Sequence, residues 1–362
     1  MKILHVYKDY FPVLGGIENH VKVLAEGQVA AGHAVTVLAC DPGRRTRVEA
    51  MNGVTVVKAG RLTTAASMPI SLSQPWRLSR LRADVIHVHS PYPLGELSAW
   101  LLGRGAALVI THHSDVVRQQ GWLRLYGPLL RRALRRADRI IATSPRYVET
   151  SPWLAPLREK CTVIPLGVDA RRFVPPLRPF AGPPTLLFAG KLRYYKGLDT
   201  LLRALADLPG VHLTVVGDGP MREPWEALAT ELHLRERVRF LGEVADADFP
   251  PLYRQAHLFV LPANARAEAF GTVILEAMAS GLACVTTEVG TGTSWVVQDG
   301  VTGRIVPPAE PYRLAGAIRG LLAHPDRLAA MGAAGRRRVE AEFDQDVMAL
   351  RVMALYESLV KR

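Results

Sequence analysis

The stretch HLFVLPANARAEAFGTVILEAMASGLACVTTE, residues 257–288, holds the pattern on which the rest of the chain is built. An apolar run, 257–263, is followed by a loop, a helical segment that begins near Gly271, and a second apolar run, 283–288. Near-continuous apolar runs separated by helical segments are typical of parallel strands that helices cover on both faces. The stretch therefore predicts one strand–helix–strand unit of an open α/β sheet.

The same alternation extends through the chain in both directions. Further strand-like runs are 2–7, 34–40, 54–60, 84–90, 107–113, 139–144 and 161–167 in the first half, and 185–190, 211–219, 238–243 and 303–308 in the second. Helical patterns such as 17–31 and 122–136 lie between them. We therefore expect an α/β protein with two doubly wound, Rossmann-like domains that face a cleft, because such sheets bind ligands at the carboxyl ends of their strands.

A proline-rich segment separates the two halves. VPPLRPFAGPP, residues 174–184, has five prolines in eleven residues, a composition that favours an extended linker over a helix or central strand. The expected organisation is a first domain over 1–173, this linker, and a second domain over 185–343. The last amphipathic helix, 344–362, is expected to return to the first domain.

Composition narrows the possible locations and partners. No apolar run approaches the roughly 20 residues that span a bilayer, and the stretch Met1–Tyr7 is too short for a signal peptide, so a cytoplasmic location is expected. Cys40, Cys161 and Cys284 lie far apart without metal-ligand spacing, which indicates buried, reduced thiols. The net charge of +12 would draw the protein toward phosphates, anionic lipids or nucleic acid, and charge alone does not choose among them.

Two glutamates flank the predicted start of the helix at Gly271. Glu276 would lie over one turn down the helix, about 7.5 Å along its axis, while Glu268 would lie beyond the N-terminus. The free amides of Thr272 and Val273, aided by the helix dipole, would hold a phosphate or diphosphate. A nucleotide-sugar has this layout, because ribose hydroxyls suit one carboxylate and sugar hydroxyls the other. The alternative is a solvated glutamate and a capping carboxylate.

EAFGTVILEAMASG, residues 268–281, resembles the E-x7-E segment of glycosyltransferase family four, and the similarity extends over nearly the whole chain. Supporting segments are GGIENHV (15–21), IPLGVDARRFVPP (164–176), AGKLRYYKG (189–197), VVGDGP (215–220), VRFLGEV (238–244) and GTGTSWVVQDGVTGRIVPP (290–308). The resemblance implies a GT-B fold in which the first domain binds the acceptor and the second the nucleotide-sugar, with retention at the anomeric carbon. YKDYFPVLGGIE (7–18) looks most like bacterial polysaccharide mannosyl- and rhamnosyl-transferases, which favours a GDP-sugar over a UDP-sugar.

The resemblance also implies roles for individual residues. Glu268 would contact the donor sugar, Glu276 the ribose, and Lys191 and Lys196 would neutralise the diphosphate leaving group. The family commonly has arginine at the position of Lys191, and a lysine keeps the charge but loses the bidentate geometry. Taken alone, each lysine would be an ordinary solvated surface charge.

Two glycines and a histidine in the first domain complete the candidates. Gly15 and Gly16 follow the first strand, where a backbone can approach a phosphate closely, although a double glycine is also a common turn. The resemblance favours contact with the donor phosphate or the acceptor. His113 ends a strand and matches the family's active-site histidine better than His112 does, although a strand-end histidine is structural about as often as functional.

The candidate catalytic residues are thus Glu268, His113, Lys196 and Lys191. The candidate donor-binding residues are Gly15, Gly16, Gly217, Phe270, Gly271, Thr272, Val273 and Glu276. His87 and His89 alternate along one strand and are expected to be packing residues.

Asp246-Ala-Asp248 matches the D-x-D metal motif of a different glycosyltransferase fold. It precedes a predicted helix, 249–255, where aspartate is a preferred N-cap, and we interpret it as a cap. Since the sequence offers no other cluster of metal ligands, we expect no cofactor and no metal.

A basic helix suggests a further partner. The segment 122–139 carries six arginines, Arg124, Arg131, Arg132, Arg135, Arg136 and Arg139. They fit either a solvated face or a surface that docks on the inner face of the cell membrane. The expected partners are a nucleotide-sugar donor and a glycan or lipid-linked glycan acceptor, together with an anionic membrane if the arginines form a docking surface.

Two other functions remain open. A UDP-sugar epimerase of the GT-B fold would share the phosphate site and need no acceptor. A basic nucleic-acid-binding protein would explain the charge and would bind in a salt-dependent way, but the sequence offers no recognised nucleic-acid module, so nucleic acid is not an expected partner.

Overall fold

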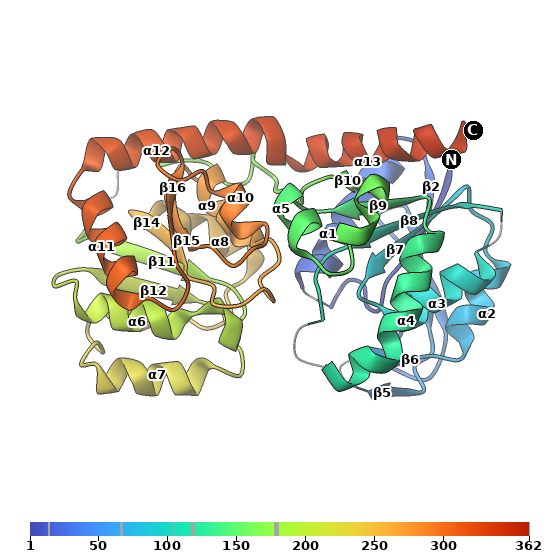
Figure 1. Ribbon diagram of the computed structural model, residues 1–362, viewed down its shortest axis with the longest axis horizontal. Helices are drawn as coiled ribbons and strands as arrows, with labels where there is room; N and C mark the ends of the chain where they lie inside the picture. The colour runs from blue at the N-terminus through green and yellow to red at the C-terminus, as the bar shows by residue number, and fades with distance from the viewer. Residues whose placement is uncertain (14, 66–67, 104, 117–119, 177–180, 362) are drawn as a thin grey trace. The chain divides into compact units, whose positions relative to one another are not determined.

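The computed structural model describes residues 1–362 except 14, 66–67, 104, 117–119, 177–180 and 362. The chain forms two compact units (Figure 1). The first comprises Met1–Leu166 and Gln345–Arg362, and the second comprises Gly167–Asp344. The two predicted α/β domains are confirmed.

The first unit is built on one large sheet. Its strands are β1 (Lys2–Val6), β2 (Ala34–Cys40), β3 (Arg47–Met51), β4 (Val54–Ala59), β7 (Val85–Ser90), β8 (Ala107–His112), β9 (Arg139–Ala142) and β10 (Cys161–Val163), with a separate pair β5 (Thr63–Ala65) and β6 (Met68–Ile70). The order is β10-β9-β8-β7-β1-β2-β4-β3, and every pairing is parallel except that of β3 with β4. The predicted parallel sheet is confirmed, with one antiparallel edge strand that was not expected.

Helices cover both faces of this sheet (Figure 1). They are α1 (Gly16–Ala30), α2 (Ser73–Arg80), α3 (Pro93–Leu102), α4 (Gln120–Arg136), α5 (Pro145–Thr150), the 3-10 helix η1 (Ala155–Lys160) and α13 (Gln345–Val360). Helices α2, α3 and α4 pack side by side, while α13 packs against α1 and β8. The C-terminal helix therefore belongs to the first unit, as expected.

The second unit has a smaller parallel sheet in the order β13-β12-β11-β14-β15-β16. Its strands are β11 (Thr185–Ala189), β12 (His212–Val216), β13 (Val238–Phe240), β14 (Leu258–Leu261), β15 (Ala283–Thr287) and β16 (Gly303–Val306). Its helices are α6 (Leu198–Ala206), α7 (Arg222–Glu231), α8 (Phe249–Arg254), α9 (Thr272–Ala279), α10 (Thr293–Val296), α11 (Pro311–Leu322) and α12 (Pro325–Arg338), with short turns η2 (Tyr194–Lys196), η3 (Asp246–Asp248) and η4 (Val339–Phe343). Helices α9 and α12 pack on β15, and α6 packs against α11 (Figure 1).

The boundary between the two units lies between Leu166 and Gly167, ahead of the proline-rich segment 174–184. Val168 donates its amide to the Phe343 carbonyl at 2.9 Å, which fixes this strand of chain to the second unit. The Phe173 ring packs against Tyr253 with 5.6 Å between centroids. Residues 177–180 of the expected linker lie outside the described residues.

Candidate active site

The loop between β14 and α9 presents a helix N-terminus. Helix α9 begins at Thr272, so the predicted start near Gly271 is confirmed. Gly271 is the N-cap residue with φ +77°, a left-handed conformation that favours glycine, and it has no side chain to accept an amide. The first N–H groups of a helix have no partner within it, so those of Thr272 and Val273 are available to an anion.

Contacts of Glu268 and Phe270 hold the same loop in place. The Thr291 hydroxyl donates to the Glu268 carbonyl at 2.7 Å. Phe270 is buried, and its ring packs against Phe343 with 6.3 Å between centroids. The enclosed ring of Phe270 therefore positions the loop, which leaves only the backbone of this residue for the donor contact that the sequence assigned to it.

Lys196 and Glu268 form a buried ion pair. The lysine Nζ lies 2.6 Å from Oε2 of Glu268, and the two residues are 8% and 7% exposed. Burial alone would lower the pKa of Lys196, but the neighbouring carboxylate outweighs it and the pKa lies above its usual value. An ammonium has three N–H donors, so a cationic Lys196 can hold Glu268 and still donate to a phosphate oxygen.

Glu276 lies on α9, one helical turn after Thr272, the first residue of the helix. Its carboxylate accepts a hydrogen bond from the Tyr253 hydroxyl at 2.6 Å. Burial raises the pKa of Glu276 to about 7, and the Tyr253 hydrogen bond opposes that shift without cancelling it. The charge of Lys196 acts on Glu276 as well. Glu268, Glu276 and Lys196 therefore form one electrostatic group at the start of α9.

Lys191 is not drawn into this group. It is exposed on the loop between β11 and η2, and it makes no ion pair within the part of the chain that the structure describes. Gly217 has a structural reason to be glycine: its φ is +119°, and a Cβ there would lie 2.2 Å from the Gly190 carbonyl oxygen. The contact of Gly217 with a donor stays a prediction.

The first unit presents Gly15 and Gly16 at the start of α1. Gly15 is the N-cap residue in extended conformation. Gly16 is exposed, and a Cβ there would meet nothing within 4 Å. The fold therefore does not require glycine at position 16, in contrast to Gly217.

This contrast gives a paired prediction. We expect Gly217→Ala to lower the free energy of unfolding by about 2 kcal/mol or more, because it combines positive φ with a backbone clash. Gly16→Ala should leave stability unchanged or raise it by about 0.5–1 kcal/mol, since it is the first residue of a helix. Urea unfolding measures both. If Gly16 is kept for a ligand, Gly16→Ala lowers activity without lowering stability; full activity would remove that role.

Histidines gather in the first unit in a way the sequence did not predict. His5, His20, His87, His89 and His113 lie within two overlapping groups, each with ring nitrogens within 4.8 Å of one another. The expectation that His87 and His89 only pack was incomplete, because they are buried and also hydrogen-bonded. Their spacing also contradicts the view that the chain has no further cluster of potential metal ligands.

His112 points elsewhere. Its Nε2 lies 3.0 Å from Oδ1 of Asp115, and its Nδ1 lies 3.3 Å from the Ser90 hydroxyl. Both of its nitrogens are thus engaged. His113 keeps Nδ1 without a hydrogen-bond partner among the described residues.

Asp246 and Asp248 do not cap α8, and that expectation was wrong. Asp248 precedes the helix but makes no side-chain cap bond. A cap accepts from the second or third helical N–H, and those positions are Pro250 and Pro251, which have none. The Asp246 carboxylate instead pairs with Arg172 at 2.7 Å.

The basic helix α4 packs one side inward. Leu130 and Leu134 are buried. The arginines at 124, 131, 132, 135 and 136 are exposed, Arg139 is half-buried, and Arg131 lies over the Trp153 ring at 5.2 Å. The side chains of Trp122, Leu123 and Leu125 lie outside the described residues. No described helix is long and apolar enough to cross a membrane.

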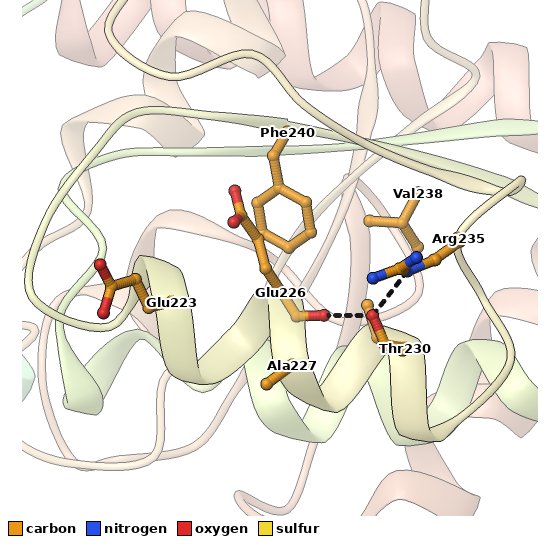
Figure 2. Close-up of a pocket in the computed structure, with 8 residues that line it drawn as sticks. Glu223, Glu226, Ala227, Thr230, Arg235, Val238 and Phe240 are labelled. Carbon is orange, nitrogen blue, oxygen red and sulfur yellow. Dashed lines mark hydrogen bonds between the residues drawn. The ribbon is translucent and has the colours of Figure 1, made fainter.

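A pocket of about 430 Å³ is lined by residues of α7 and β13 and of the turn between them. Figure 2 shows these residues. Glu223, Glu226, Thr230 and Arg235 supply its polar side chains. Arg235 donates to the Thr230 hydroxyl at 2.9 Å. None of the candidate residues lines this pocket, so it is separate from the group around Lys196 and Glu268.

The chain is similar in sequence to known families and to individual proteins. Residues 14–172 match the family described as Glycosyltransferase Family 4, and residues 170–338 match Glycosyl transferases group 1. The chain is 38% identical to the D-rhamnosyltransferase WbpZ of Pseudomonas aeruginosa over 95% of this chain and 92% of the relative. It is 34% identical to the O-antigen chain mannosyltransferase C of Escherichia coli over 100% of this chain and 99% of the relative.

The fold has equally complete matches. A sucrose-phosphate synthase from Thermosynechococcus elongatus superimposes with a TM-score of 0.83 at 25% identity, covering 99% of this chain and 98% of the other. The two Rossmann-like units are thus those of the GT-B fold.

Proposed function

Because the chain belongs to glycosyltransferase family four, we propose that it moves a sugar from a nucleoside diphosphate donor to an acceptor hydroxyl with retention at the anomeric carbon. The observation that carries the proposal is the buried pair of Lys196 and Glu268 beside the uncapped N-terminus of α9. A cation, a carboxylate and free helix amides are what a diphosphate joined to a sugar requires.

In the proposed reaction the bond between the anomeric carbon and a diphosphate oxygen breaks. Lys196 and the amides of Thr272 and Val273 stabilise the charge that develops on the leaving diphosphate, and the exposed Lys191 adds to it on the loop side. Glu268 orients the sugar through its hydroxyls, and Glu276 binds the ribose. The acceptor hydroxyl oxygen forms its bond to the anomeric carbon on the same face as the leaving group departs, and its proton passes to an oxygen of the departing diphosphate. These cationic groups do the work that a metal does elsewhere, so we propose transfer without a metal.

The donor we favour carries a manno-configured sugar on GDP. The two relatives are named as a D-rhamnosyl- and a mannosyl-transferase, and D-rhamnose is 6-deoxy-D-mannose. The acceptor would then be a growing glycan of a cell-surface polysaccharide, free or lipid-linked, bound by the first unit.

The exposed arginines of α4 would hold the enzyme at an anionic membrane, which co-sedimentation with anionic vesicles at low and high salt can test.

A donor screen tests the function. Purified protein is incubated with GDP-mannose, GDP-D-rhamnose and UDP-glucose, and nucleotide release and sugar products are followed. We expect GDP release that depends on a glycan acceptor. A product that remains a nucleotide-sugar would favour an epimerase instead, and release of no nucleotide from any donor with a range of acceptors would contradict transfer.

The raised pKa of Glu276 predicts how donor binding depends on pH. With a pKa of about 7, the carboxyl is mostly protonated at pH 6 and mostly ionised at pH 8. An ionised carboxylate accepts hydrogen bonds from ribose hydroxyls more strongly, so donor affinity should rise several-fold, by about 1 kcal/mol, between these pH values.

Titration calorimetry with GDP-mannose measures this effect. The phosphodiester groups of an intact nucleotide-sugar stay ionised throughout, which free GDP would not guarantee. Glu276→Gln is the matched control and should bind with little pH dependence. A wild-type affinity that is flat or falls between pH 6 and pH 8 would contradict the role of Glu276.

A further inference from the structure

Three of the five histidines form a continuous hydrogen-bonded chain. Nε2 of His113 lies 3.0 Å from Nδ1 of His89, and Nε2 of His89 lies 3.1 Å from Nδ1 of His5. The chain ends where Nε2 of His5 lies 2.8 Å from Oε1 of Gln28, on α1. His5 and His89 come from neighbouring parallel strands, and His113 follows the third.

In this hydrogen-bonded chain of histidines, the donor and the acceptor of each bond can be assigned. Burial lowers the pKa of His5 to about 4 and holds the pKa values of His89 and His113 well below their usual range, so each ring is neutral and carries one proton. A carbonyl oxygen only accepts, so the proton of His5 is on Nε2. Its Nδ1 must then accept from His89, whose Nδ1 in turn accepts from His113.

We propose that Gln28, His5 and His89 act as positioning residues that fix His113 in its Nε2–H tautomer, leaving Nδ1 as a bare acceptor for a substrate hydroxyl. That nitrogen is buried and has no hydrogen-bond partner among the described residues. An unpaired buried acceptor costs about 1–3 kcal/mol, which favours a hydroxyl that fills it. The inference rests on the proposed function for His113, and it adds what sets that residue's protonation pattern.

A metal site on the same rings fits less well. Both ring nitrogens of His89 form hydrogen bonds within the histidine chain. Both ring nitrogens of His87 form hydrogen bonds to residues outside that chain. The Tyr356 hydroxyl lies 2.5 Å from Nδ1 of His87, and the Thr111 hydroxyl lies 2.6 Å from Nε2 of His87. A metal would have to break these bonds, whereas the hydrogen-bonded chain of His113, His89 and His5 leaves the His87 bonds intact.

The test is long-range ¹H–¹⁵N NMR of protein labelled at its 11 histidines, with assignment by single substitutions. We expect one Nε2–H tautomer at His5, His89 and His113 in the wild type. Gln28→Leu and His5→Phe remove an acceptor and should give mixed tautomers at His113. They should also lower kcat about tenfold with donor KM little changed, as second-layer partners do for ligating histidines.

His87→Phe is the matched control, since His87 is equally buried, touches His89 and lies outside the chain. It should leave the His113 tautomer unchanged. A wild-type Nδ1–H tautomer at His113, or the same spectrum of His113 in Gln28→Leu and His5→Phe, would overturn the inference whatever the activity. Full activity of His113→Ala would instead remove the proposed role of His113 while the spectra still decide whether the chain exists.

Discussion

Lys196→Met is expected to lower kcat for sugar transfer by about 100-fold or more, and also to lower the free energy of unfolding by about 3 kcal/mol. The first effect follows because the leaving diphosphate loses the cation that neutralises it. The second follows because Glu268, 7% exposed, would be left as an unpaired buried charge. Steady-state kinetics with a saturating acceptor and urea unfolding measure the two effects separately.

The double variant Lys196→Met with Glu268→Gln separates stability from catalysis. Removing the stranded charge should recover most of the lost stability, since neutral groups replace both members of the pair. Activity should not recover, because the leaving group still lacks its cation. If Lys196→Met kept kcat within about threefold of the wild type, Lys196 would have no role in the transition state.

Substitution of Glu268 and substitution of Glu276 should change different kinetic parameters, kcat for the first and donor KM for the second. Glu268→Gln is expected to lower kcat by about 100-fold with a small change in donor KM, because it acts on the sugar whose bond is breaking. Glu276→Gln is expected to raise donor KM by about tenfold with kcat within about threefold. The ribose contact is equally strong in the ground state and the transition state, and losing a hydrogen bond to a charged acceptor costs about 1.5–3 kcal/mol.

Both variants are isosteric, so each serves as the control for the other, and circular dichroism confirms that they fold. The split requires initial rates over a range of donor concentrations above and below KM. Equal effects of the two variants on kcat would mean that the assignment of sugar and ribose to these carboxylates is wrong.

The fold was predictable because its strands are nearly continuous apolar runs. Every predicted strand is present, and the helix start at Gly271 was located from the loop sequence alone. Strands β3, β5 and β6 were not predicted. Of these, β3 is exposed and charged, with sequence Arg47-Val48-Glu49-Ala50-Met51, so apolar content did not reveal it. Its turn, Asn52-Gly53, has φ of +49° and +82° and is a typical hairpin signal that could have located it.

The site was predictable only where it is local in sequence. The spacing of Glu268 and Glu276 around a helix start follows from helix geometry. The ion pair of Glu268 with Lys196 depends on β11 lying beside β14, and the chain His113–His89–His5 depends on the order β8-β7-β1. Strand order and register are set by long-range packing, which the residues of one strand do not encode.

The proposed function depends above all on the N-terminus of α9 and Lys196 holding the donor diphosphate. A crystal structure of the protein with bound GDP or GDP-mannose tests it directly. We expect diphosphate oxygens within hydrogen-bond distance of the Thr272 and Val273 amides and of Lys196 Nζ, with the ribose on Glu276. A nucleotide bound with its diphosphate away from α9, and with the Lys196–Glu268 pair untouched, would contradict it.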